Sequence, residues 1–233
     1  MQQTVLRITG LLFVMALFAY PSIAQTKIGV RAGMNLSGVN LVDEQGDKQK
    51  TGMIPRFQAG LTVDIPITAD FYVQPAALYS GKGFRQDGGW LASADAEFKA
   101  TASYFEVPVN LLYKPRVGGG SLIVGAGPYI AYGTGGKWEA DQGQVAIGDI
   151  MIEPHGDVIF KNDVADGEWG NYLYGKPWDY GVNLIAGYEF LRKLSVQFNA
   201  QFGVSNLEPD LDGQKPDGKL RNTVYGISIG YKL

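Results

Sequence analysis

The feature that most constrains this chain is an alternation of large apolar residues with small or polar residues, which recurs eight times. In the last segment the apolar members are Tyr225, Ile227, Ile229, Tyr231 and Leu233. Successive side chains of a β-strand point to opposite faces, so each segment predicts a strand with one apolar and one polar face. The segments are 27–36, 56–65, 71–82, 104–114, 122–133, 179–190, 194–204 and 225–233. Each is long enough for the ~9–11 residues of a tilted transmembrane strand.

The distribution of charge and the lengths of the connections indicate which solvent each face meets. Charged residues interrupt the polar faces at mid-strand, whereas the apolar faces are nearly free of charge. A soluble β-sandwich would alternate too, with its polar face outside. The connections favour a membrane barrel, because short ones alternate strictly with long ones. The short ones are 67–70, 115–120 and 191–193, and the long ones are 38–52, 85–100, 134–178 and 206–219.

Short periplasmic turns and long external loops are typical of outer-membrane barrels. Aromatic residues near the strand ends, such as Tyr79, Tyr113 and Tyr188, suit the two membrane interfaces. We therefore predict an all-β fold, an eight-stranded antiparallel up-and-down transmembrane β-barrel. A closed barrel leaves no backbone group exposed to lipid, which an open sheet would do.

The N-terminus has the pattern of a secretory signal peptide. Arg7 precedes an apolar run from Gly10 to Tyr20, and a small-x-small pattern ends at Ala24. The run is shorter than the ~20 residues of a membrane-spanning helix, which argues against a retained anchor. We expect cleavage after residue 24, a mature barrel over residues 25–233, and residence in the outer membrane of a Gram-negative bacterium.

Composition excludes several classes of function. The chain has no cysteine, so it has no disulfide, no thiolate metal site and no lipid-modified N-terminal cysteine. A net charge of −3 gives no reason to expect a nucleic-acid partner. The expected partners are the lipid of the outer membrane and a protein or glycan at the external loops.

The polar strand faces carry eight charged residues that we expect to form a polar network in the lumen. They are Arg31, Arg56, Asp64, Lys82, Glu106, Lys114, Asp179 and Glu189. Eight strands enclose a space that side chains can fill, and an unpaired buried charge is costly. Four cations against four anions therefore predict a lumen plugged by ion pairs and not an ion-selective channel.

The long external loop 134–178 is unusually aromatic. Its candidate contact residues are Trp138, Trp169, Tyr172, Tyr174 and Trp178. Exposed aromatic side chains can stack on sugars or dock a partner protein. The alternative is structural: the same side chains would fold the loop over the barrel mouth, or Trp178 would mark the membrane interface.

Five segments also resemble a known family. They are Lys27–Ser37, Gln74–Gly83, Tyr104–Tyr113, Gly125–Tyr129 and Asp179–Glu189. In this order they resemble the strands of the PorT-like outer-membrane β-barrel family, over essentially the whole mature chain. The resemblance implies an eight-stranded barrel broadly similar to the OmpA and OmpX type. Two features depart from it: Ala76 stands where an acidic residue is usual, and the loop 134–178 is longer than in a typical member.

No set of residues predicts catalysis, a cofactor or a metal. His155, with Glu153 and Asp157 nearby, is the only histidine and lies in a glycine- and aspartate-rich loop. The acidic residues of loop 134–178 do not follow a calcium-binding spacing. Glu106 facing Arg31 or Arg56 would be the remaining candidate pair, but a single histidine cannot supply a Ser/His/Asp set.

We therefore predict a non-enzymatic outer-membrane protein with a structural role or with surface contacts through its external loops. The first alternative is a narrow transport or secretion-machinery component. The second is a membrane-embedded hydrolase or acyltransferase, which would depend on Glu106 or His155.

Overall fold

The computed structural model describes residues 26–89, 92–141, 145–147, 150–152, 154–165 and 172–233. Eight long strands dominate this part of the chain. They are β1 (Lys27–Val42), β3 (Gly52–Pro66), β4 (Phe71–Gly89), β5 (Ala92–Tyr113), β7 (Gly120–Ala140), β13 (Trp178–Phe190), β14 (Leu194–Gly203) and β16 (Lys219–Lys232). Each pairs antiparallel with the next in this order, and β16 pairs with β1, which closes the ring. The predicted eight-stranded antiparallel up-and-down barrel is confirmed.

The remaining strands are short and lie outside the ring of eight. They are β2 (Lys48–Gln49), β6 (Arg116–Val117), β8 (Val145–Ile147), β9 (Ile150–Ile152), β10 (His155–Phe160), β11 (Asp163–Val164), β12 (Tyr172–Gly175) and β15 (Asp210–Leu211). The strand β10 pairs with the end of β7, and β12 extends this sheet alongside β10. Among the described residues, no helix has the length and apolar character needed to cross a lipid bilayer.

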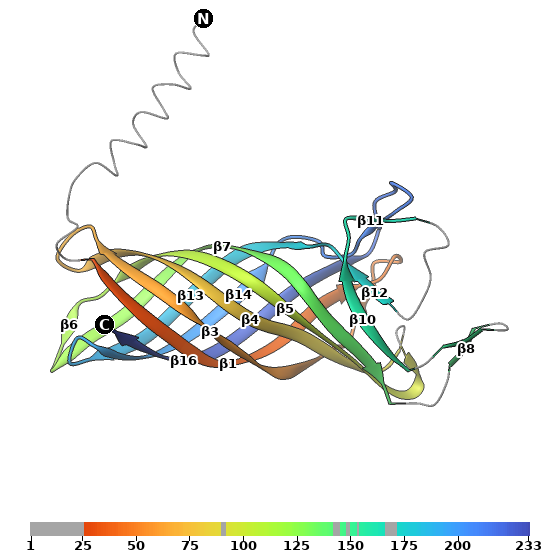
Figure 1. The fold of residues 1–233 in the computed structure, drawn as a ribbon, viewed down its shortest axis with the longest axis horizontal. Coiled ribbons are helices and arrows are strands. Elements are labelled where there is room, and N and C mark those ends of the chain that lie inside the picture. Colours follow the sequence, from red (N-terminus) through yellow and green to blue (C-terminus); the bar gives the residue numbers. More distant parts are fainter. Residues whose placement is uncertain (1–25, 90–91, 142–144, 148–149, 153, 166–171) are drawn as a thin grey trace, which may run out of the picture.

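The two ends of the barrel differ in length and content (Figure 1). The C-terminus and the short turns lie at one end, which we call the periplasmic end. At the other, external end, β4, β5 and β7 extend beyond their neighbours and carry β10 and β12. The prediction of a long loop over 85–100 is wrong, since β4 continues to Gly89 and β5 starts at Ala92. Likewise, β7 continues to Ala140, past the predicted loop start at Thr134.

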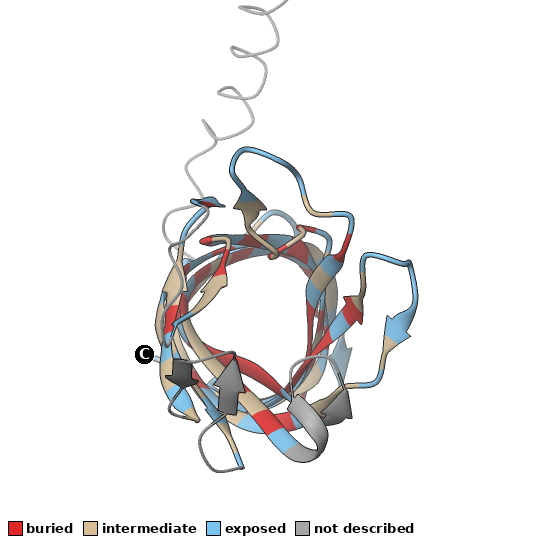
Figure 2. Cartoon of the chain, turned by 90° about the vertical axis from the view of Figure 1, so that its right-hand side faces the viewer, coloured by how far each residue is buried: buried red, intermediate tan, exposed pale blue. Residues whose placement is uncertain are grey.

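Burial along the strands is inverted relative to a water-soluble protein. Large apolar side chains face outward and are exposed, as for Ile229 (58 %), Phe198 (58 %) and Leu111 (52 %). The residues between them are polar and buried, and buried and exposed residues both occur around the closed ring of strands (Figure 2). Such an exterior is stable only against hydrocarbon, because apolar surface in water costs about 25 cal/mol per Å². The fold therefore places these strands in a membrane.

Aromatic residues mark both edges of the lipid-facing band. On the external side Tyr79, Phe105, Tyr132 and Trp178 are register partners on four successive strands, and Trp178 packs edge-to-face on Tyr132. On the periplasmic side Tyr113 packs against Phe71, its register partner on β4, with ring centroids 4.9 Å apart. Tyr113 lies eight residues from Phe105 on β5. Eight residues at a tilt of ~40° correspond to ~20 Å, close to the ~25 Å apolar band of such barrels.

Above the lipid-facing band the inside of the barrel changes from polar to apolar. The buried members of this external core are Val39, Leu41, Phe84, Phe98 and Ala100, and Trp138, Ala140, Leu173 and Leu220 pack against them. The Phe98 and Trp138 rings are stacked with centroids 5.8 Å apart. The extensions of β4, β5 and β7 are thus held by a small hydrophobic core of their own, which explains why they stay ordered as strands outside the membrane.

Candidate functional site: the lumen and the external rim

The external half of the lumen is organised around one buried lysine. Lys82 on β4 is fully buried and its Nζ lies 2.8 Å from Asp179 Oδ2 and 3.1 Å from Glu106 Oε2. The same Nζ lies 4.6 Å from the centre of the Tyr129 ring. We call Lys82, Glu106 and Asp179 the external cluster. Two carboxylates and the rings of Tyr129 and Tyr104 surround the ammonium group, so the cation is compensated inside the barrel.

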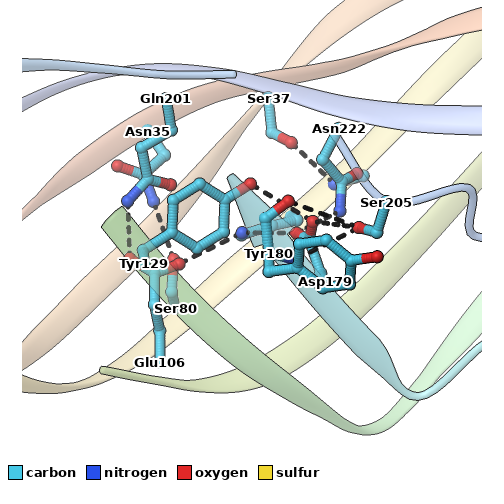
Figure 3. A network of polar contacts seen from close by, with 12 residues as sticks. Asn35, Ser37, Ser80, Glu106, Tyr129, Asp179, Tyr180, Gln201, Ser205 and Asn222 are labelled. Carbon is cyan, nitrogen blue, oxygen red and sulfur yellow. Dashed lines mark hydrogen bonds and ion pairs between the residues drawn. The ribbon is translucent and has the colours of Figure 1, made fainter. Parts of the chain in front are cut away.

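Neutral donors complete this cluster (Figure 3). The Asn222 side-chain amide donates to Asp179 Oδ2 at 2.9 Å, and the Tyr129 hydroxyl donates to Oδ1 at 3.2 Å. Gln201 donates to the carboxylate of Glu106. Gln201 is on β14 and Glu106 is on β5, so this bond joins two strands that are separated in the ring by β13 and β7.

The periplasmic half of the lumen holds a second set of charges. Lys114 Nζ pairs with Asp64 and lies 3.5 Å from Glu189 Oε2, while Lys232 Nζ lies 2.6 Å from Asp64 Oδ2 and also pairs with Glu189. We call Lys114, Lys232, Asp64 and Glu189 the periplasmic cluster. Two ammonium groups alternate with two carboxylates, so each charge has two opposite neighbours.

Amide side chains cross the lumen between the two clusters. Gln58 on β3 donates to Asn199 on β14 at 3.2 Å, and Asn183 on β13 donates to Asn110 on β5 at 2.8 Å. Arg31 on β1 donates to Gln197 on β14 at 3.4 Å. All these side chains are buried. Hydrogen bonds through the lumen therefore join strands that are not neighbours in the ring, at several levels along the barrel.

The predicted network residues do not all lie together. Seven of the eight are buried, namely Arg31, Asp64, Lys82, Glu106, Lys114, Asp179 and Glu189. Six of them belong to the two clusters, while Arg31 lies between the clusters. Arg56 is the exception.

Arg56 points to the outside of the barrel. It lies where the β3–β4 register shifts, between Met53 and Gln58. On β4, the neighbours of Gly81 point into the lumen, so Gly81 faces outward; a Cβ atom there would lie 3.2 Å from Arg56 Cβ. Arg56 also lines an outer recess with Tyr79 and Lys137. The assignment of Arg56 to the lumen is wrong, because a bulge redirects a side chain that simple alternation places inside.

Lys232 takes the place of Arg56 in the charge balance. It was not predicted as a network residue, although it shares the alternation phase of Ser228 and Gly230 on the lumen face of the last strand. With Lys232 included and Arg56 removed, four cations still face four anions: Arg31, Lys82, Lys114 and Lys232 against Asp64, Glu106, Asp179 and Glu189. The signal for Lys232 was thus present in the sequence.

The candidate loop aromatics have different positions. Trp138 belongs to the external core, and Trp178, which is 49 % exposed, belongs to the external aromatic band. Tyr172 and Tyr174 lie on β12, with ring centroids 6.2 Å apart, and Tyr172 is 50 % exposed. Trp169 lies outside the described residues. Of the four described members, Tyr172 and Tyr174 remain as contact candidates above the membrane.

Glu106 and His155, on which a catalytic role would depend, lie in different environments. Glu106 is held by Lys82 and Gln201 inside the lumen, whereas His155 is exposed on β10. The described parts of the chain contain no group of three or more His, Cys, Asp or Glu side chains arranged to hold a metal ion.

A closed barrel with an apolar exterior, two aromatic bands and a charged, filled interior defines an integral outer-membrane protein. The family comparison agrees: residues 23–208 match the model of the outer membrane protein beta-barrel domain. The chain belongs to this family, which is named for the fold and not for a ligand. A comparison with curated proteins finds no match.

Several solved outer-membrane barrels are similar in structure. Ail of Yersinia pestis, solved with the heparin analogue sucrose octasulfate, is 13 % identical, covers 89 % of this chain and 99 % of its own, and has a TM-score of 0.40. Neisserial surface protein A is 9 % identical, with coverages of 88 % and 97 % and a TM-score of 0.42. OprG of Pseudomonas aeruginosa is 16 % identical, with coverages of 89 % and 95 % and a TM-score of 0.36.

Proposed function

We propose that this protein is a non-conducting outer-membrane barrel that presents its external end to a protein or glycan partner. The observation that carries the proposal is the combination of a bridged lumen with an ordered external sheet. A protein built for passage of solutes needs a free path, whereas this lumen is crossed by hydrogen bonds and ion pairs at several levels. The role is non-enzymatic, and no cofactor is required.

The external sheet supports a contact role for two reasons. First, β12 is the last strand of its sheet, since the described strands pair with only one of its edges. A free strand edge can accept a strand of a partner. Second, the exposed Tyr172 and the half-buried Tyr174 lie on this strand, and tyrosines suit both protein and sugar contacts. The proposed contact surface is therefore β12, with Tyr172 at its exposed face.

The first experiment measures conductance of the purified barrel in planar bilayers. We expect no steady ion-selective current, because the two clusters and the amide bridges occupy the axis. A positive control is the variant Gln58→Ala/Gln201→Ala/Asn183→Ala, which removes three side chains that bridge the lumen and should admit ions. Steady currents from the unchanged protein would instead favour a transport component.

The second experiment tests the external surface. The backbone amide of Ala140 donates to the Pro154 carbonyl at 2.7 Å, so the residues that flank the segment 141–153 lie side by side. Replacing residues 142–152 by Asn-Gly should keep the β7–β10 pairing and the barrel. Tyr172→Ala/Tyr174→Ala alters β12 alone. Loss of surface adhesion or partner capture in the tyrosine variant, with normal heat-modifiable gel migration, supports the proposal; unchanged binding in both variants overturns it.

Two finer assignments are part of this proposal. The segment 1–24 acts as a cleaved signal peptide, which N-terminal sequencing of the membrane protein tests. The barrel is of the PorT-like type, on the strength of its strand segments. A role in a secretion machinery would rest on fold analogy alone, so the contact role is preferred.

A further inference from the structure

Exposed cations gather around a groove on the outer wall of the barrel, just beyond the external aromatic band. The groove has a volume of 790 Å³ and lies over the external ends of β14, β16, β1 and β3. Its wall includes Lys48, Lys50, Lys219 and Arg221, together with Phe202 and Tyr225. We call this feature the basic groove.

The polarity of the basic groove changes along the barrel axis. On β16 the outward residues run from Tyr225 through Thr223 to Arg221, because Asn222 and Val224 point inward and are buried. Phe202 and Tyr225 are 40 % and 44 % exposed and their rings pack edge-to-face, in line with the lipid-facing band. Arg221 lies four residues further out, about 13 Å along the strand. The part of the groove nearest the hydrocarbon is therefore aromatic, with Phe202 and Tyr225, and the part further out is positively charged.

The exposed cations of the basic groove lack ion-pair partners in the described part of the chain. None of the described residues forms an ion pair with Lys48, Lys50, Lys219 or Arg221, although other exposed cations do so, as Lys99 does with Glu139 at 2.7 Å. The nearby carboxylate of Asp43 accepts bonds from Asp47 N and Gln49 Nε2 within its own turn. Four exposed positive charges therefore lie at a membrane interface without an ion-pair partner in the part of the chain that the structure describes.

A second recess repeats this arrangement elsewhere on the wall. It has a volume of 360 Å³ and is lined by Arg56 and Lys137, next to Tyr79 of the external aromatic band and the hydroxyls of Thr101 and Ser103. Asp157 is the register partner of Lys137 on β10, yet it makes no ion pair with that lysine. The outward turn of Arg56 at the β3–β4 bulge thus adds a cation at the membrane edge.

From this geometry we propose that the basic groove binds the phosphate-bearing headgroup of an outer-leaflet glycolipid. The hydrocarbon chains lie along Phe202, Tyr225 and the apolar wall below them, and the phosphates meet Lys219, Arg221, Lys48 and Lys50. Phosphate suits both side-chain types, since arginine offers a planar donor fork and lysine a compact charge. A soluble anion would use only the upper half of the groove, whereas a lipid uses both halves. The inference rests on the outer-membrane location and is independent of any external partner.

The test uses the full mature protein in detergent micelles, with bound lipid counted by native mass spectrometry. The probes are bisphosphorylated lipid A, the same lipid without its phosphates, and inorganic pyrophosphate. We expect lipid A to bind, the dephosphorylated lipid to bind at least tenfold more weakly, and pyrophosphate alone to bind more weakly than lipid A. The variant K219Q/R221Q should lower lipid A affinity by about tenfold or more, because each cation near an anionic lipid surface contributes about fivefold.

The matched control is R192Q/K193Q, which removes two exposed cations from the periplasmic turn and changes the net charge equally. Heat-modifiable gel migration verifies that each variant is a folded barrel. Equal lipid A binding by K219Q/R221Q and the unchanged protein overturns the proposal, as does equal loss in the control variant. If the dephosphorylated lipid binds as tightly as lipid A, the phosphates have no role in binding. If pyrophosphate binds as tightly as lipid A, the groove is a site for soluble anions and not for a lipid.

Discussion

Lys82 Nζ lies 2.8 Å from Asp179 Oδ2, although their strands β4 and β13 are separated in the ring by β5 and β7. The pair therefore ties two non-adjacent parts of the barrel wall together through the lumen. Glu106 approaches the same ammonium group from β5. This arrangement makes Lys82 the residue on which the external half of the polar network depends.

Replacing Lys82 by methionine should destabilise the barrel strongly. Lys82→Met leaves the carboxylates of Glu106 and Asp179 buried without their cation, a loss of about 3–5 kcal/mol in the free energy of unfolding. The measurement is urea unfolding in lipid vesicles. Lys99→Met is the matched control, since its pair with Glu139 is exposed and is worth at most ~1 kcal/mol. The triple variant K82M/E106Q/D179N should recover part of the loss, because no buried charge is left uncompensated.

Removing Trp138 should loosen the external sheet without opening the barrel. Its ring stacks on Phe98 in the external core, so Trp138→Ala creates a cavity there at a cost of up to about 3–5 kcal/mol locally. We expect faster proteolysis of β10 and β12 on intact cells, with unchanged heat-modifiable migration. Tyr172→Ala is the comparison, because that side chain is half exposed. Equal protease sensitivity of the two variants would contradict the assigned role of the external core.

Gly127 should not tolerate a side chain. A Cβ atom at this position would lie 1.9 Å from the Val109 carbonyl oxygen on β5, so the β5–β7 backbones approach too closely for alanine. Gly127→Ala should cost about 1–3 kcal/mol or prevent folding. Gly119→Ala, in the turn before β7, has nothing within 4 Å of the added atom and should behave like the unchanged protein. The yield of heat-modifiable barrel after refolding distinguishes the two.

Glu208, in an external loop, should make that loop sensitive to pH. Its pKa lies above the usual 4.5 because of burial first and the negative charge of Glu44 second, and Lys176 opposes the shift. The native loop therefore holds this proton at a pH where the unfolded loop has lost it, so the ionised side chain disfavours the native loop above its pKa. As the pH falls through the folded pKa toward 4.5, the penalty disappears.

The variant Glu208→Gln tests this sign. We expect its loop to be more protected than the original at pH 7, as measured by hydrogen exchange of the Leu220 amide, which donates to Asn206 Oδ1. The difference should shrink through pH 4.5 and vanish about one pH unit below it, where glutamic acid is neutral in both states. Greater protection of the unchanged protein at pH 7 would show that the charge is favourable there.

Much of the barrel wall follows from local pattern. The phase of alternation assigned Ile227 and Ile229 to lipid, and assigned Lys82, Glu106 and Asp179 to the interior, because a strand has a strict period of two. The same phase would also have found Lys232. It misplaced Arg56, since the bulge between Met53 and Gln58 interrupts the period and has no signature in the sequence.

The lengths of the strands at the external end could not be predicted from the local pattern. Residues 85–100 contain glycine, aspartate and alanine and have no clear alternation, so a loop was predicted. Residues 85–89 and 92–100 are strands because Phe84 and Phe98 meet Val39 and Leu41 from β1 in the external core. These contacts join segments far apart in the chain, and no local pattern contains them.

Local periodicity along the chain was sufficient to predict eight strands and their two faces, since each strand carries its own alternation. The nearly charge-free apolar faces and the short turns indicated the membrane as solvent. Only ring closure decided which side chains meet across the lumen, where the bulge turns Arg56 outward, and how Lys219 and Arg221 come to share a groove with Lys48 and Lys50. Such encounters depend on the shear and twist of the closed sheet, which arise when all eight strands pair at once.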